Sequence, residues 1–79
     1  MYVRVLFFGA TADLAGHRSV ELDLANSSTV LEALSTITNK HSAFANHKLL
    51  FAVNQEYVSN DMKLKDGDEL AIFTAVSGG

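Results

Sequence analysis

The chain has 79 residues, 48% of them hydrophobic, with a formal net charge of −3 and no cysteine. This composition supports a globular fold and excludes a disulfide framework, a zinc–thiolate site and a cysteine nucleophile. It also lacks the clustered Lys and Arg needed to bind nucleic-acid phosphates, an apolar stretch of roughly 20 residues that would span a membrane, and the layout of a signal peptide. We therefore expect a single cytoplasmic domain with neither a nucleic-acid nor a membrane partner.

Alternating apolar residues predict two strands in the first part of the chain, over residues 2–8 and 19–24. The residues expected to face inward are Val3, Val5 and Phe7 in the first strand and Val20, Leu22 and Leu24 in the second. Residues 9–18 then form the loop of a hairpin, with about one helical turn that Gly16 ends.

One amphipathic helix is expected next. Thr29 and Glu32 have the spacing of a capping box, in which each side chain satisfies the free amide of the other residue. The apolar stripe recurs at intervals of three and four and consists of Val30, Leu34 and Ile37. The helix should therefore extend to about Asn39.

The second half of the chain contains a polar segment followed by further strands. Residues 40–48 predict a loop or short helix anchored by Phe44. The strand signals that follow are an apolar run suited to a central strand (Leu49–Asn54), a brief extended piece (57–58) and, after a turn at 66–68, a last strand (Glu69–Val76). Two strands, one helix and three strands predict an α+β fold of the β-grasp (ubiquitin-like) type. Its mixed sheet has four to five strands, with the main helix on one face.

The side chains that could carry chemistry form no convincing catalytic site. His17, His41 and His47 lack the spacing of metal ligands, so we interpret them as solvated histidines. Four carboxylates gather near the final turn, where a turn-forming and solvating role is favoured over acid/base catalysis; they are Asp61, Asp66, Asp68 and Glu69. On these residues the chain is not an enzyme by itself.

The end of the sequence, Ala75-Val76-Ser77-Gly78-Gly79, directly follows the last predicted strand and carries no charged side chain. Glycine allows the backbone to approach another surface closely, so such a tail presents its terminal carboxylate without obstruction. The alternative is a frayed end with no function. We expect a flexible tail over about residues 75–79 of a single domain comprising residues 1–79.

Residues 49–79 closely resemble the C-terminal half of the MoaD-type sulfur carriers, the small subunits of molybdopterin synthase in the MoaD/ThiS family of ubiquitin-like proteins. The matching residues are Ala52-Val53-Asn54, Val58-Ser59, Leu64, Asp66-Gly67-Asp68-Glu69 and Val76-Ser77-Gly78-Gly79. Residues 5–16 are similar to the first strand and following loop of that family, whereas residues 25–48 match in pattern only.

The resemblance implies a function in molybdenum cofactor biosynthesis. A ubiquitin-activating-type adenylyltransferase would use ATP to convert the Gly79 carboxylate into an acyl-adenylate, and a sulfur donor would then leave a thiocarboxylate. The tail, with Gly78, would enter the large synthase subunit and donate sulfur to cyclic pyranopterin monophosphate. The chain itself would bind no cofactor or metal, and it would form a heterotetramer with the large subunit.

The resemblance also implies a docking surface for that partner. Alternation from Leu70 places Leu70 and Ile72 inward and Phe73 on the opposite face, where Tyr57 could join it. Phe73, Tyr57, Val76 and Ser77 are therefore the expected partner-binding residues. The alternative is that the two aromatic residues only shield the edge of the sheet.

Three other functions stay open at this point. The sequence Thr74-Ala75-Val76 is similar to the sulfur carriers of the thiamine pathway (ThiS-type), although Gln55 and Ser77 favour the molybdopterin branch. The same tail would suit a ubiquitin-like protein modifier that is attached to lysines. A β-grasp binding module with an inert tail is the third possibility.

Overall fold

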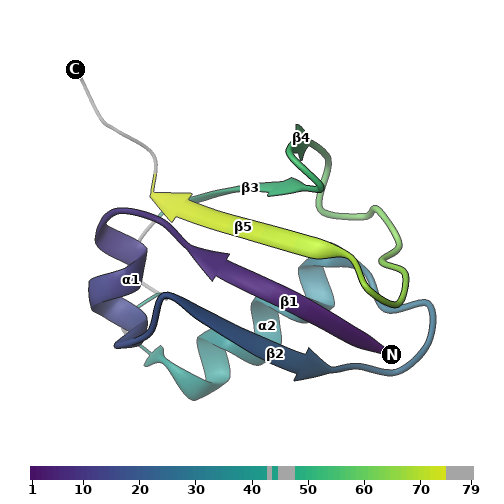
Figure 1. Cartoon of the computed structure of the whole chain (residues 1–79), viewed down its shortest axis with the longest axis horizontal. Coiled ribbons are helices and arrows are strands. Elements are labelled where there is room, and N and C mark those ends of the chain that lie inside the picture. Colours follow the sequence, from purple (N-terminus) through teal and green to yellow (C-terminus); the bar gives the residue numbers. More distant parts are fainter. Residues whose placement is uncertain (43, 45–47, 75–79) are drawn as a thin grey trace.

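The computed structural model describes residues 1–42, 44 and 48–74. Five strands form one sheet in the order β2-β1-β5-β3-β4 (Figure 1). The strands are β1 (Tyr2–Phe7), β2 (Ser19–Asp23), β3 (Leu49–Val53), β4 (Glu56–Tyr57) and β5 (Glu69–Thr74). β1 and β5 are parallel, and the other neighbouring strands are antiparallel. The sheet is therefore mixed, as predicted.

The main helix, α2 (Val30–Lys40), lies behind the sheet in Figure 1 and leaves the other face open. This arrangement confirms the predicted α+β class. β3 lies inside the sheet, as its apolar run predicted, with β5 on one side and the two-residue β4 on the other, although the middle strand of the five is β5. The apolar run from Leu49 reflects the packing of β3 against the core, and it does not determine the position of β3 in the strand order. Within the described ranges, no helix is long and apolar enough to cross a membrane.

The core lies between α2 and the covered face of the sheet. The three inward residues predicted for β1 are all buried, and Leu22 is their counterpart in β2. Val20 is only half-buried, because β2 is an edge strand with a neighbour on one side. Leu24 is also half-buried and lies one residue beyond β2, which ends earlier than predicted. The fully buried aliphatic side chains of the sheet and α2 are Val3, Val5, Val30, Ala33, Ile37, Leu70 and Ile72.

The loop predicted over residues 9–18 contains a complete short helix, α1 (Ala10–Ala15), where only about one turn was expected. Gly16 ends it with a left-handed backbone (φ 74°), as predicted. The Oγ1 atom of buried Thr11 lies 2.8 Å from the carbonyl oxygen of Ile72 and 2.7 Å from that of Phe8. Helices this short are marginal alone, so the contact with β5 stabilises α1.

The predicted capping box at the start of α2 is confirmed. The amide of Glu32 donates to Thr29 Oγ1 at 3.3 Å, and the amide of Thr29 donates to Glu32 Oε1 at 3.0 Å. The next two free amides, of Val30 and Leu31, donate to carbonyl oxygens of the segment 60–62. The helix begins as predicted and continues one residue beyond the expected end.

Phe44 is the anchor of the segment between α2 and β3, as predicted. Its side chain is 1% exposed, and its ring stacks on Phe7 with centroids 5.8 Å apart. The His41 ring lies nearly perpendicular to the Phe44 ring, with centroids 6.1 Å apart. This packing places Phe44 in the core although its neighbours in sequence are polar.

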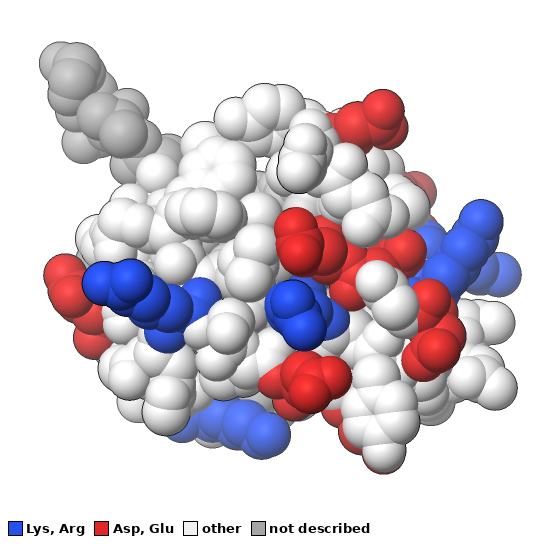
Figure 2. Space-filling view, viewed as in Figure 1, with Lys and Arg blue, Asp and Glu red and all other residues white. Residues whose placement is uncertain are grey.

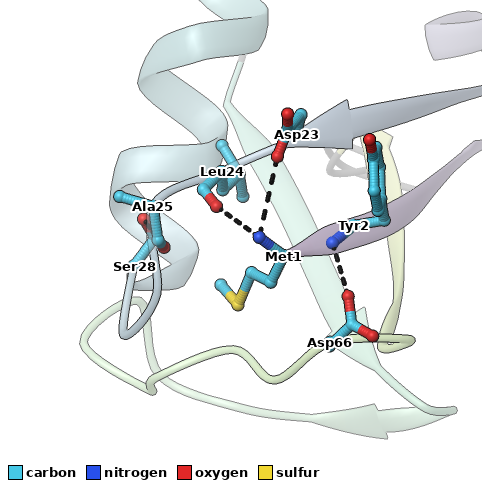
Figure 3. A network of polar contacts seen from close by, with 7 residues as sticks. All are labelled: Met1, Tyr2, Asp23, Leu24, Ala25, Ser28 and Asp66. Atoms are coloured by element: carbon cyan, nitrogen blue, oxygen red, sulfur yellow. Dashed lines mark hydrogen bonds and ion pairs between the residues drawn. The ribbon is translucent and has the colours of Figure 1, made fainter.

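Polar contacts join the beginning of β1 to the end of β2 and to the turn before β5 (Figure 3). The amino nitrogen of Met1 donates to the carbonyl oxygen of Leu24 at 2.7 Å, and the amide of Tyr2 donates to Asp66 Oδ1 at 2.7 Å. Gly67 has a φ of 87°, which a side chain would disfavour. The turn predicted at Asp66-Gly67-Asp68 is thereby confirmed.

The last two strands differ from prediction at their ends. The brief strand β4 comprises Glu56 and Tyr57 instead of residues 57–58. β5 begins at Glu69 as predicted, and its last described residue is Thr74. The expected extension to Val76 lies outside the described residues.

Candidate docking surface

The two faces of β5 differ in exposure as the alternation predicts. Leu70 and Ile72 are 0% exposed beneath α2. Ala71 and Phe73 lie on the open face and are half-buried. Because β5 leads directly into residues 75–79, its open face is the described surface nearest in sequence to the tail.

A shallow groove runs over this open face, and we call it the open-face groove. It is lined by Leu6, Phe8, Ala52, Gln55, Tyr57, Glu69, Ala71 and Phe73, which come from β1, β3, β4, β5 and the adjoining turns. Figure 2 shows an uncharged area across the upper left of this face, with acidic and basic side chains at its lower and right margins. An apolar patch with a charged rim is typical of a protein-binding surface.

Tyr57 and Phe73 meet in the groove, as predicted. Their rings make an edge-to-face contact with centroids 5.9 Å apart and an interplanar angle of 73°. Tyr57 nevertheless remains 74% exposed. A ring this exposed shields little of the sheet, which favours docking over the edge-shielding alternative.

Phe8 also lines the groove, although it is not among the predicted partner-binding residues. Its side chain is 51% exposed and lies one residue beyond β1. The alternation of the first strand predicts its position: Phe7 faces inward, so Phe8 lies on the opposite face. The parallel pairing of β1 with β5 then brings it to the same groove as Phe73.

The turn between β3 and β4 forms one wall of the groove and has an unusual backbone. Asn54 and Gln55 have φ values of 50° and 71°, the left-handed region that two-residue hairpin turns require. Asn tolerates this conformation, whereas for Gln it costs about 1 kcal/mol or more. The turn therefore needs other interactions to hold it.

The side chain of Asn54 supplies those interactions. Its Nδ2 donates to Asp68 Oδ1 at 3.0 Å, and its Oδ1 accepts from the amide of Glu69 at 3.1 Å. The amide of Asn54 donates to the carbonyl oxygen of Glu69 at 2.8 Å. Asp68 in turn accepts from the amide of Lys65 at 2.8 Å. The turn is thus fastened to the beginning of β5.

The predicted acidic cluster has the turn-forming role that was favoured. Asp66 and Asp68 accept backbone amides, and Ser59 donates to Asp61. Glu69 lies with Arg4 and Glu21 in a second, charged hollow on the exposed surface. Glu69 also lines the open-face groove and so forms part of its charged margin.

The remaining predicted site residues are not brought together. Within residues 1–42, 44 and 48–74, no three side chains of the metal-ligating types are grouped as a metal site would require, and His17 and His41 belong to different parts of the fold. His47, Val76, Ser77, Gly78 and Gly79 lie outside the described residues. The geometry therefore supports docking and shows no catalytic constellation among the described side chains.

Comparison with known proteins decides the family. Residues 5–79 match the ThiS family. The chain belongs to this family. Its relatives include the molybdopterin synthase sulfur carrier subunit of Chlamydomonas reinhardtii, 36% identical with 100% of both chains covered. That of Haemophilus influenzae is 38% identical, with 98% of this chain and 99% of the relative covered.

Solved structures of similar fold support the ThiS family assignment and the β-grasp prediction. A putative molybdopterin converting factor, subunit 1, from Pyrococcus furiosus has a TM-score of 0.91 at 30% identity and covers 96% of this chain and 99% of its own. Small archaeal modifier protein 1 of Haloferax volcanii has a TM-score of 0.85 at 26% identity, covering 95% and 98%. A complex of subunits 1 and 2 of the molybdopterin-converting factor from Helicobacter pylori gives 0.69 at 26%, covering both chains fully.

Proposed function

We propose that this protein is the sulfur carrier subunit of a molybdopterin synthase and functions in molybdenum cofactor biosynthesis. The observation that carries the proposal is the open-face groove, whose aromatic residue Phe73 lies on the strand that leads into Val76-Ser77-Gly78-Gly79. A docking surface on the strand that leads in sequence to two glycines suits delivery of those glycines to a partner. The sulfur carrier relatives of the ThiS family support the same assignment.

The chemistry in this proposal occurs at the carboxylate of Gly79. A carboxylate is a poor electrophile, and adenylation with ATP by a partner enzyme provides AMP as a leaving group. A sulfur nucleophile attacks the acyl carbon, the bond to AMP breaks, and a C-terminal thiocarboxylate remains. Its sulfur then bonds to cyclic pyranopterin monophosphate, water cleaves the bond between that sulfur and the acyl carbon, and the Gly79 carboxylate is restored. The chain carries sulfur in this way without a cysteine.

The acid and base groups for these steps belong to the partners in this proposal. This division of roles agrees with the described residues, among which no catalytic constellation is present. The large synthase subunit receives the tail, with Phe73, Tyr57, Val76 and Ser77 as contacts and two copies of each subunit in the assembly. The carrier acts in the cytoplasm, binds no cofactor itself, and meets ATP only on the activating enzyme.

Intact-mass measurement provides the most direct test. The purified chain is incubated with ATP, an adenylyltransferase of the ubiquitin-activating type and sulfide, and we expect the mass gain that corresponds to exchange of one oxygen for sulfur. The thiocarboxylated product should then convert the pyranopterin precursor when a large synthase subunit is added. Failure to pass sulfur to the precursor with any large subunit would disprove the proposal.

Protein modification is a second candidate, favoured by the similarity to the small archaeal modifier protein. It shares activation up to the acyl-adenylate but ends in an isopeptide bond to a lysine. Mass spectrometry of cellular conjugates distinguishes the two functions. Complete absence of isopeptide-linked adducts would eliminate the modifier function.

A further inference from the structure

Gln55 is placed in a backbone conformation that its side chain disfavours. Among the described residues, three that are not glycine have a positive φ: Ser27 (68°), Asn54 (50°) and Gln55 (71°). The two central residues of the β3–β4 turn both need this conformation, for which Asn followed by Gly is the most favourable pair. Gln at the second position is thus a local disadvantage for folding.

The structure holds the disfavoured turn in place from one side. The side chain of Asn54 bonds to Asp68 and to the amide of Glu69, and β4 adds only a two-residue pairing with β3. These contacts hold the backbone of Gln55 in place. They do not explain why the residue is Gln instead of the more favourable Gly. Strained residues retained by surrounding contacts tend to occur at functional sites.

The surroundings of Gln55 suggest what its side chain does. It lines the open-face groove together with Phe8, Tyr57 and Phe73, and it is exposed. In this largely apolar groove its amide can both donate and accept a hydrogen bond. Glu69, which also lines the groove, carries a charge, so Gln55 is the only neutral amide side chain among the lining residues. A polar group within a largely apolar contact surface contributes mainly to specificity, because a partner that leaves it unpaired loses affinity.

We propose that the side-chain amide of Gln55 is a specificity-determining contact for the protein that occupies the open-face groove. The occupant is the large synthase subunit, so this inference rests on the proposed function. Its contacting surface must present apolar side chains to Phe8, Tyr57 and Phe73 and a hydrogen-bonding group to Gln55. The disfavoured backbone at Gln55 is retained because glycine would remove that contact.

The test compares stability with affinity in Gln55→Gly. Glycine relieves the disfavoured backbone, so the Tm should rise by about 5 °C. Loss of the amide should weaken binding to the large subunit by about five- to tenfold, the effect expected for one hydrogen bond. A residue with a purely structural role would not shift stability and affinity in opposite directions.

Two further variants make the result decisive. Ser27→Gly is the matched control: Ser27 has nearly the same φ and does not line the groove, so its Tm should rise with unchanged affinity. Gln55→Ala removes the amide but keeps a disfavoured backbone, so it should lose as much affinity as Gln55→Gly without the gain in Tm. The affinities of Gln55→Gly, Gln55→Ala and Ser27→Gly are all measured by calorimetric titration with the wild-type large subunit.

The outcomes separate the inference from the proposed function. If the wild-type chain binds no large subunit and accepts no sulfur, the proposed function fails. If the wild type binds normally and Gln55→Gly and Gln55→Ala bind equally well, only the role of Gln55 is disproved. Weaker binding by Gln55→Gly alone would also overturn it, because the backbone rather than the amide would then be responsible.

Discussion

The two faces of the sheet differ in what their apolar residues do. On the face beneath α2, Leu70 and Ile72 are fully buried and belong to a continuous core. On the open face, Phe8 and Tyr57 remain 51% and 74% exposed around the groove. Apolar surface removed from water stabilises the fold, whereas apolar surface left exposed is available to a partner. The covered face therefore stabilises the fold, and the open face is available for recognition.

The largest effect is expected from deletion of Gly79, which tests whether the open face serves the tail. Sulfur transfer should be abolished, because the reacting carboxylate moves by up to about 3.5 Å, and displacement by 1 Å alone can cost roughly 100-fold in rate. The Tm should not change, since the core of the described residues ends at Ile72. Thiocarboxylate formation and precursor conversion are measured together. Wild-type transfer by the deletion variant would remove the tail from the mechanism.

Ile72→Ala tests the covered face. The side chain is fully buried between the sheet and α2, so truncation should lower the free energy of unfolding by about 3 kcal/mol. The affinity of the folded molecules for the large subunit should stay the same, because Ile72 does not line the groove. Urea titration gives the stability and calorimetry at low temperature gives the affinity. A large loss of affinity with normal stability would mean that the covered face also contacts the partner.

Tyr57→Ala is the corresponding test of the open face. We expect a loss of about 2 kcal/mol of binding free energy, typical of an aromatic anchor at the centre of an interface. The free energy of unfolding should fall by only about 0.5 kcal/mol, because the ring is largely exposed. Phe73→Ala should show the same order of effects when both are measured by titration and urea melts. Reversal of that order would show that the aromatic pair serves the sheet rather than the partner.

Thr29→Ala should have the smallest effect and tests how α2, the helix over the covered face, is stabilised at its beginning. It removes the hydroxyl that accepts from the amide of Glu32 at the start of α2. The expected loss is about 1 kcal/mol of unfolding free energy, or about 5 °C in Tm, without change in partner affinity. Thr29→Ser keeps the cap and serves as the control. Equal melting temperatures for the two variants would contradict the role of the capping box.

The sequence alone determined the features that depend on local periodicity and local hydrogen bonds. Alternation assigned the faces of β1 and β5, and the Thr29–Glu32 spacing located the beginning of α2. The orientation of Phe73 followed from the same alternation. These features are predictable because neighbouring residues along the chain fix them.

Only the tertiary structure decided which strands are neighbours. The order β2-β1-β5-β3-β4 makes β5 the middle strand, and it brings Phe8, Gln55 and Phe73 into one groove from separate parts of the chain. It also explains α1, whose Thr11 contacts the carbonyl oxygen of Ile72. Strand pairing is a sum of many long-range contacts, and no single segment contains that information. The sequence thus determined the faces, whereas the tertiary structure determined which residues share them.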